Sequence, residues 1–125
     1  MEKLTNGESC PSRSNLASAP PGINATLQVL TGKWKIAILW RLMKGRVRFG
    51  ELRRSIPGVS QHMLTSQLRE LEMDGVVSRA VYPEVPPRVE YTLTEHGASL
   101  GQVLKTLAEW GEIHHRRQMD APGPS

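Results

Sequence analysis

The chain has 125 residues, 38% of them hydrophobic, and carries a formal net charge of +4 with a pI near 9.6. This length allows one domain with a modest hydrophobic core, and a basic chain suits a polyanionic partner. A single cysteine excludes an internal disulfide framework. The longest apolar run, residues 36–40, is too short to span a bilayer, so we expect a cytoplasmic protein without a membrane partner.

The positive charge is concentrated in one segment. Residues 33–54 have a net charge of +7, whereas residues 1–32 sum to zero and residues 55–125 to −3. This segment is where a polyanion is expected to approach. It contains one acidic residue, Glu51, and eight basic ones: Lys33, Lys35, Arg41, Lys44, Arg46, Arg48, Arg53 and Arg54.

The two ends of the chain have little to bury. Residues 1–22 mix Ser, Asn, Gly and Pro and predict a flexible arm, and residues 119–125 predict a disordered tail. The domain is therefore expected over residues 23–118. It opens with a short helix around Leu27, followed by a helix over residues 33–44 that is apolar almost all round and belongs at the centre of the domain.

A helix-turn-helix pattern follows. Residues 46–49 are a short extended link, and Phe49, Leu52 and Ile56 place one face of the next helix in the core. Pro57-Gly58 then predicts a tight turn. A second helix begins after Ser60, a good N-cap. Two short helices joined through a glycine-containing turn are typical of DNA-binding helix-turn-helix units.

The two faces of the second helix differ in chemistry. Leu64, Leu68 and Leu71 form one stripe and predict burial, and Gly75 suits the helix end. The outer face carries short hydrogen-bonding side chains and one arginine, which is the chemistry of base recognition in a major groove. Any surface helix can also have a polar outer face. The neighbouring elements must therefore decide between a DNA-reading face and an ordinary solvent-exposed one. The predicted DNA-reading residues are Ser60, Gln61, His62, Thr65, Ser66 and Arg69.

A hairpin is predicted after Gly75. Residues 76–82 and 89–93 have strand character, and the three prolines between them mark the loop. Arg88 lies at the exit of this loop, so the hairpin is expected to act as a wing whose arginine reaches a minor groove or a phosphate. Additional DNA contacts are expected from Lys33, Lys35 and Arg48 of the basic segment.

A long last helix is expected from Glu95 to about residue 118, capped by Thr94. At about 36 Å it is longer than so small a domain needs, so we predict that its apolar stripe packs against a second subunit. The alternative is that the helix folds back on its own core. The stripe predicted to form a homodimer contains Leu100, Val103, Leu104, Leu107, Trp110 and Gly111.

Four sequence elements together resemble the HxlR-type winged helix-turn-helix transcription regulators of bacteria, a MarR-like group. They are Gly32-Lys33-Trp34-Lys35, Arg48-Phe49-x-Glu51-Leu52, Leu64-Thr65-x-x-Leu68-Arg69-x-Leu71-Glu72-x-Asp74-Gly75, and Pro86-Pro87-x-Val89-Glu90-Tyr91-x-Leu93-Thr94-x-x-Gly97. The resemblance covers about residues 23–116. It implies a mainly α, α+β winged helix-turn-helix fold with a two-stranded wing and a long C-terminal dimerisation helix.

The resemblance also implies a function. A homodimer would bind a two-fold operator in double-stranded DNA, with residues 60–69 in the major groove and Arg88 as the wing contact. Trp34, Phe49 and Tyr91 would belong to the core. Many members respond to electrophiles through a cysteine at the start of the first helix, but that place falls at Pro20-Pro21 here, and Cys10 lies about ten residues upstream. Redox sensing by the family's route is therefore not expected.

Other kinds of site have little support. His96, His114 and His115 could in principle bind a metal ion. No second cysteine or carboxylate lies at ligand spacing from them, so we expect no metal and no cofactor. No pattern of an enzyme's nucleophile or paired carboxylates is present.

The competing function is a winged-helix module that binds protein without sequence-specific DNA binding, which would need an apolar patch in place of the basic one. A small-molecule effector is compatible with DNA binding, with Trp40 and Trp110 as candidates to line its pocket and packing as their alternative role.

Overall fold

The computed structural model describes residues 18–120, which belong to two units, one ending at Thr31 and the other beginning at Gly32. The first unit contains α1 (Pro21–Leu30), which has proline at its first positions. Proline suits that place because its fixed φ matches the helix and its missing N–H would have no helical partner. The expected first helix is confirmed. No helix in residues 18–120 is long and apolar enough to cross a membrane.

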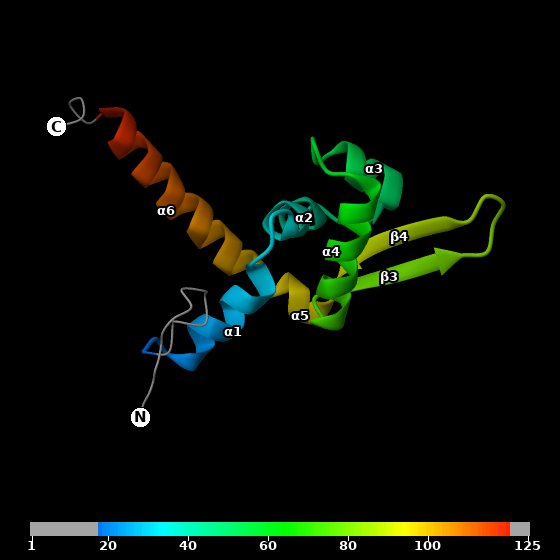
Figure 1. Cartoon of the computed structure of the whole chain (residues 1–125), viewed down its shortest axis with the longest axis horizontal. Helices are drawn as coiled ribbons and strands as arrows, with labels where there is room; N and C mark the ends of the chain where they lie inside the picture. Colours follow the sequence, from blue (N-terminus) through cyan, green and yellow to red (C-terminus); the bar gives the residue numbers. More distant parts are fainter. Residues whose placement is uncertain (1–17, 121–125) are drawn as a thin grey trace. The chain divides into compact units, whose positions relative to one another are not determined.

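The second unit is mainly helical with a small antiparallel sheet. The hairpin β3–β4 and the long helix α6 project from opposite sides of the body formed by α2, α3 and α4 (Figure 1). This confirms the expected fold class. The elements are α2 (Lys35–Leu42), β2 (Val47–Arg48), α3 (Phe49–Arg54), α4 (Gln61–Met73), β3 (Val77–Tyr82), β4 (Arg88–Leu93), α5 (Glu95–Ala98) and α6 (Gly101–Asp120).

The core of this unit lies where α2, α3 and α4 meet the sheet. The leucine stripe predicted for α4 is completely buried. Tyr91 is also buried and its ring centroid lies 6.3 Å from that of Phe49, but Phe49 and Trp34 are only half-buried. The buried apolar residues are Ile38, Leu39, Leu42, Val47, Leu52, Ile56, Val59, Leu64, Leu68, Leu71, Val76, Val77, Tyr91 and Leu104.

The sheet has three strands, in the order β2-β4-β3, where the sequence predicted two. The segment expected to be only an extended link contains β2, which pairs with β4 in the register Val47↔Tyr91 and Arg48↔Glu90. The hairpin itself pairs Val77↔Leu93 through to Tyr82↔Arg88. Strand β2 therefore attaches the base of the hairpin to the helix-turn-helix unit.

The long last helix predicted to begin at Glu95 is divided into two helices, α5 and α6. The hydroxyl of Thr94 accepts a hydrogen bond from the backbone N–H of Gly97 at 2.9 Å and caps α5, which ends at Ala98. The hydroxyl of Ser99 then donates to the carbonyl of His96, and such a side-chain bond competes with the helical ladder. Helix α6 restarts at Gly101 and runs to Asp120, slightly beyond the expected end.

Candidate nucleic-acid interface

Helix α4 is fixed at both ends and along its buried side. The Ser60 hydroxyl accepts a hydrogen bond from the backbone N–H of Met63 at 3.1 Å, as expected for an N-cap. Gly75 has φ +78°, a left-handed conformation that glycine adopts without steric cost. The Lys35 ammonium lies 2.5 Å from a Glu70 carboxylate oxygen and ties α4 to α2. The orientation of the exposed face of α4 is therefore well defined.

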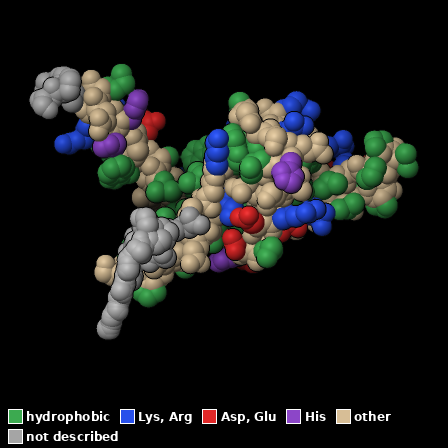
Figure 2. All heavy atoms as spheres, viewed as in Figure 1, with side chains coloured by type: hydrophobic (Ala, Val, Ile, Leu, Met, Phe, Trp, Pro, Cys, Tyr) green, Lys and Arg blue, Asp and Glu red, His purple; other side chains and the backbone are tan. Residues whose placement is uncertain are grey.

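That exposed face has the composition predicted for it. Gln61, His62 and Arg69 are exposed, and Thr65 and Ser66 are partly exposed. No residue in 18–120 forms an ion pair with Arg69, so its guanidinium is available to an external acceptor. Figure 2 shows Lys and Arg side chains in several separate groups on this face, with Asp and Glu side chains near the lower end of α4.

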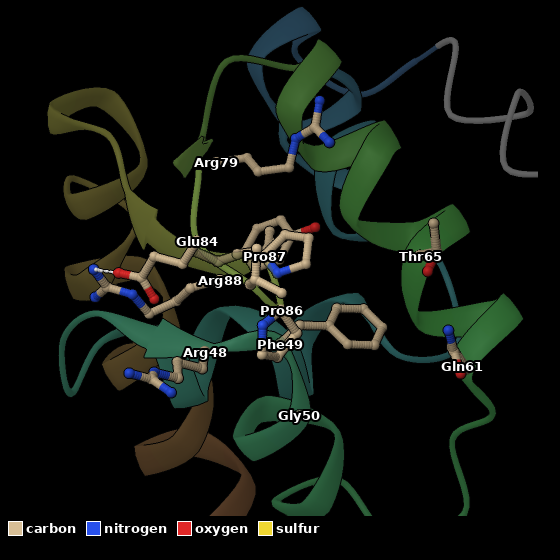
Figure 3. Close-up of a pocket in the computed structure, with 13 residues that line it drawn as sticks. Arg48, Phe49, Gly50, Gln61, Thr65, Arg79, Glu84, Pro86, Pro87 and Arg88 are labelled. Atoms are coloured by element: carbon tan, nitrogen blue, oxygen red, sulfur yellow. Dashed lines mark hydrogen bonds and ion pairs between the residues drawn. The ribbon is translucent and has the colours of Figure 1, made fainter. Parts of the chain in front are cut away.

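A groove lies between α4 and the hairpin, with a volume of about 530 Å³. It brings together four of the predicted site residues, Gln61, Thr65, Arg48 and Arg88 (Figure 3). In this view Arg88 and Glu84 point toward one another on the side away from Gln61 and Thr65. The other lining residues are Phe49, Gly50, Arg79, Glu84, Val85, Pro86, Pro87, Val89 and Tyr91.

Glu90 of β4 is surrounded by three arginines. Its carboxylate oxygens lie 2.7 Å from Arg88 Nη1, 3.4 Å from Arg46 Nη1 and 4.0 Å from Arg48 Nε. Burial alone would raise the pKa of Glu90, but the hydrogen bonds and charges of Arg88 and Arg46 outweigh it and hold the pKa below the usual range of a carboxyl group. The cluster therefore carries a net positive charge around an ionised carboxylate at neutral pH.

The Arg88 side chain is held by contacts within the hairpin and does not extend freely from its tip. Its Nη2 lies 2.9 Å from Glu84, its guanidinium carbon lies 3.9 Å from the centroid of the Tyr82 ring, and 25% of its side chain is exposed. Hydrogen bonding to Glu84 raises the pKa of Arg88, against the effect of burial. A DNA contact by Arg88 stays a prediction, and it would compete with two carboxylates.

The predicted contact by Lys35 is wrong. This side chain is buried, at 4% exposure, and its charge is balanced by Glu70 within the subunit, so it has no path to a phosphate. Lys33 is exposed, and its ammonium lies 5.0 Å from the centroid of the Trp34 ring. Lys33 does not line the groove, and its contact with DNA stays a prediction.

Arg79 is a groove residue that the sequence did not single out. It pairs with Tyr91 across β3 and β4, and its Nε lies 3.6 Å from Glu72 near the end of α4. In Figure 3 its side chain lies beside α4. The available signal was an arginine between Val77 and Val81 on one face of a strand, where a hydrophobic residue is expected.

The stripe of α6 divides into a buried and an exposed part. Leu104 is buried within the subunit and Leu100 and Val103 are half-buried. Leu107 is 50% exposed, Trp110 is 65% exposed, and Gly111 is exposed as well. The ring of Trp110 stacks on His114 with centroids 4.9 Å apart. Hydrophobic side chains also show along α6 in Figure 2.

The other candidates from the sequence are the histidines and Cys10. Among residues 18–120 no three His, Cys, Asp or Glu side chains are arranged to hold a metal ion. Cys10 lies outside the described residues. The place aligned with the family's sensing cysteine is occupied by Pro20 and Pro21, at the start of α1.

The sequence matches the model of the family described as HxlR-like helix-turn-helix over residues 29–119. The chain belongs to the HxlR-like helix-turn-helix family. One relative is the uncharacterized HTH-type transcriptional regulator YtcD of Bacillus subtilis (strain 168), 53% identical over 95 residues that cover 76% of this chain and 75% of the relative. The chain is thus a helix-turn-helix transcriptional regulator by family.

Solved structures agree with this HxlR-like assignment. The crystal structure of the HTH-type regulator ytcD aligns with a TM-score of 0.73 at 53% identity, covering 76% of this chain and 97% of the other. The redox regulator HypR in its reduced form aligns with a TM-score of 0.75 at 45% identity, covering 80% and 99%. The expected resemblance to HxlR-type, MarR-like regulators is confirmed.

Proposed function

We propose that this HxlR-like protein is a homodimer that binds a two-fold operator in double-stranded DNA. Helix α4 enters the major groove with its N-terminal half, where Gln61, His62 and Thr65 meet base edges, and Arg69 contacts the DNA further along. The observation that carries this proposal is the exposed polar face of α4 beside an arginine-lined groove.

The hairpin β3–β4 serves as the wing. The groove between α4 and the hairpin has cationic walls from Arg48 and Arg79, so it suits the sugar-phosphate backbone that flanks a major groove. The loop at residues 83–87 joins the two strands of the hairpin and would reach the adjoining minor groove or backbone. Phosphate contacts at the wing would position α4 without adding sequence information themselves.

The second subunit is proposed to pack on α6 and α2. Ile36, Trp40, Leu107, Trp110 and Ile113 are all exposed in the single chain. Ile36, Trp40 and Leu107 also line a shallow groove of about 240 Å³ between the two helices. Large apolar side chains gathered on one surface indicate an interaction site. Two recognition helices related by a two-fold axis would lie about 34 Å apart, one turn of B-DNA.

DNase footprinting on the DNA that flanks the protein's own coding region tests this proposal. The expected result is protection of an inverted repeat whose half-site centres are about one helical turn apart. Replacing both Gln61 and Thr65 with Ala should abolish protection while leaving α4 folded, because both side chains point away from the core. Exposed Ser78→Ala, on β3 outside the groove, is the control. A chain that protects no DNA but captures a protein partner through α4 would instead be the protein-binding module.

A further inference from the structure

Helix α2 lies between α4 and the face proposed for the second subunit. It packs against α4 and against α6, and it stands between them in Figure 1. Ile36 and Trp40 of α2 are exposed and belong to the face proposed for the second subunit. Lys35, the residue before Ile36, is buried and bonds to Glu70 of α4. One helix therefore carries both part of the dimer face and an attachment to the helix proposed to read DNA.

The Lys35–Glu70 ion pair is enclosed on the side of the lysine. The Lys35 side chain is buried, whereas that of Glu70 is half-exposed. A Cβ on Gly32 would lie 2.7 Å from Gln67 Oε1 and 3.0 Å from Cδ of Lys35, so the backbone that enters α2 presses on α4 beside the pair. An apolar side chain of similar length would fill this space without taking a charge out of water. Packing alone therefore does not explain a lysine here.

The pair supplies a directional contact that the leucine stripe of α4 lacks. Leu64, Leu68 and Leu71 are completely buried. Apolar burial is non-directional, and packed helix pairs scatter by about 15–20° around their preferred crossing angles. A charge-assisted hydrogen bond has a defined geometry. Glu70 lies about 100° around the helix from Leu71, so its bond to Lys35 acts at the flank of the stripe and opposes pivoting of α4 against α2.

The distance from this junction to the reading end of α4 makes small angles matter. Gln61 lies nine residues before Glu70, which is about 13 Å along the helix axis. A pivot of about 15° at Glu70 would move the reading end by about 3 Å, close to the ~3.4 Å rise of one base pair. In a dimer, such a shift changes the distance between the two half-sites that the protein can contact together.

We propose that Lys35 and Glu70 are positioning residues that hold α4 at a fixed angle to the dimer face and so set the half-site spacing that the protein accepts. Neither residue has to touch DNA in this role. The inference rests on the proposed function, since it requires a homodimer on a two-fold operator. It gives the buried Lys35 a part in DNA binding that is not a phosphate contact.

A second ion pair on α4 provides an internal control. Glu72 lies on the opposite flank, about 100° from Leu71 in the other direction. One of its carboxylate oxygens lies 3.6 Å from Arg79 Nε. Arg79 belongs to β3 of the hairpin, and the hairpin is not part of the proposed dimer face. Loss of this pair would loosen α4 from the wing and leave its attachment to α2 unchanged.

Fluorescence anisotropy on a series of labelled operators tests the proposed role. The duplexes carry the two half-sites found by footprinting, with their centres moved apart or together in steps of one base pair. The original protein should bind best at one spacing and about tenfold more weakly one base pair away, because one half-site then loses base contacts. Lys35→Met keeps an unbranched side chain in the buried space and leaves Glu70 in water. It should bind the best spacing more weakly and lose most of the preference over the neighbouring spacings.

An isolated half-site and two further variants separate positioning from folding. Lys35→Met should bind a duplex with one half-site as well as the original protein does, because a single half-site imposes no spacing. Lys35→Met combined with Glu70→Gln leaves no unpaired charge and should repeat the profile of Lys35→Met, because the two residues act as one pair. Glu72→Gln should keep the original optimum. Circular dichroism establishes that each variant is folded.

An unchanged spacing profile in both Lys35 variants would overturn the inference. It would also be overturned by an equal loss on the half-site and on the full operator, since the pair would then only keep α4 folded. A profile broadened as much by Glu72→Gln as by Lys35→Met would overturn it too. A sharp optimum that survives in the variants contradicts this inference alone. An original protein without any preferred spacing contradicts the proposed two-fold operator, and this inference falls with it.

Discussion

Gly97 is the point where α5 touches the backbone at the start of β3. The backbone N–H of Thr94 donates to the carbonyl of Val76 at 3.1 Å, and its hydroxyl donates to the carbonyl of Gly75 at 2.7 Å. These bonds hold α5 so close that a Cβ on Gly97 would lie 1.9 Å from the Val76 carbonyl oxygen. The third residue after the cap, Gly97, must therefore be one without a side chain.

Replacing Gly97 with Ala should lower the free energy of unfolding by about 3 kcal/mol, because backbone on both sides must move. Urea denaturation measures this loss. Gly50→Ala is the matched control: its Cβ would meet only the flexible end of Arg54, at 3.6 Å. In helix α3 that change should be neutral or stabilise by up to about 1 kcal/mol. Equal stability of the two variants would show that α5 does not depend on this close approach.

Arg69 and Arg88 are expected to play different parts on DNA. Arg69 has no acidic partner in residues 18–120, and its removal should cost on the order of 1 to 3 kcal/mol of operator binding and relax the sequence preference. Arg88→Ala should weaken binding to all sequences more evenly. Anisotropy on matched and mismatched operators distinguishes the two. Identical behaviour of both variants on both operators would refute this division.

Glu90 should make stability depend on acid pH. Its pKa is lowered in the folded protein, chiefly because its hydrogen bond and charge interaction with Arg88 outweigh the effect of burial. The stabilisation is therefore complete above the ordinary carboxyl pKa of about 4.3 and is lost as the pH falls through the lower folded value. Thermal melts of Glu90→Gln should fall less between neutral and acid pH than those of the original protein. Glu109→Gln, an exposed site on α6, should behave like the original.

At the scale of elements, local periodicity predicted most helices and the hairpin. The leucine stripe, the Ser60 cap and Gly75 define α4 because each is a signal within one helix. Strand β2 was not predicted because it has only two residues. It is a strand because it pairs with β4, which lies more than forty residues later in the sequence.

Site residues that depend on distant partners were also missed. Lysine is rarely buried unless it is paired, so the sequence alone predicted that Lys35 is an exposed cation. Its partner, Glu70, lies on a helix distant in sequence. Arg79 lies in the groove because β3 pairs with β4 in a register that places it opposite Tyr91. No local sequence pattern specifies that register. The exposed face of α4, by contrast, follows from its own periodicity, and the four groove residues named from the sequence were local to their elements.

Helix α6 should tolerate a charge on its exposed stripe without unfolding. Leu107 is half-exposed in the single chain, so Leu107→Asp should give a folded monomer if this face forms the dimer. Gln102→Asp adds the same charge at an exposed position on another face of α6 and should leave the dimer intact. Light scattering and circular dichroism measure mass and folding. An original protein that is monomeric at micromolar concentration would remove the basis of a two-fold operator.

At the scale of the whole molecule, the arrangement of charge predicts how binding responds to salt. Of the eight basic residues between 33 and 54, three form ion pairs with Glu70 or Glu90. The other five have no acidic partner in residues 18–120: Lys33, Arg41, Lys44, Arg53 and Arg54. A dimer therefore offers up to ten unpaired cations from this segment, besides Arg69 of each subunit.

Each phosphate neutralised contributes about −0.9 to the slope of log affinity against log salt concentration, so roughly six contacts in the dimer give a slope of about −5 or steeper. Titrations of operator between about 50 and 200 mM salt measure this slope. The monomeric Leu107→Asp variant should show about half of it, since each subunit supplies half of the contacts. A slope near zero in the dimer would mean that the basic segment does not face phosphate, and the protein-binding alternative would then account better for the exposed surface of α4.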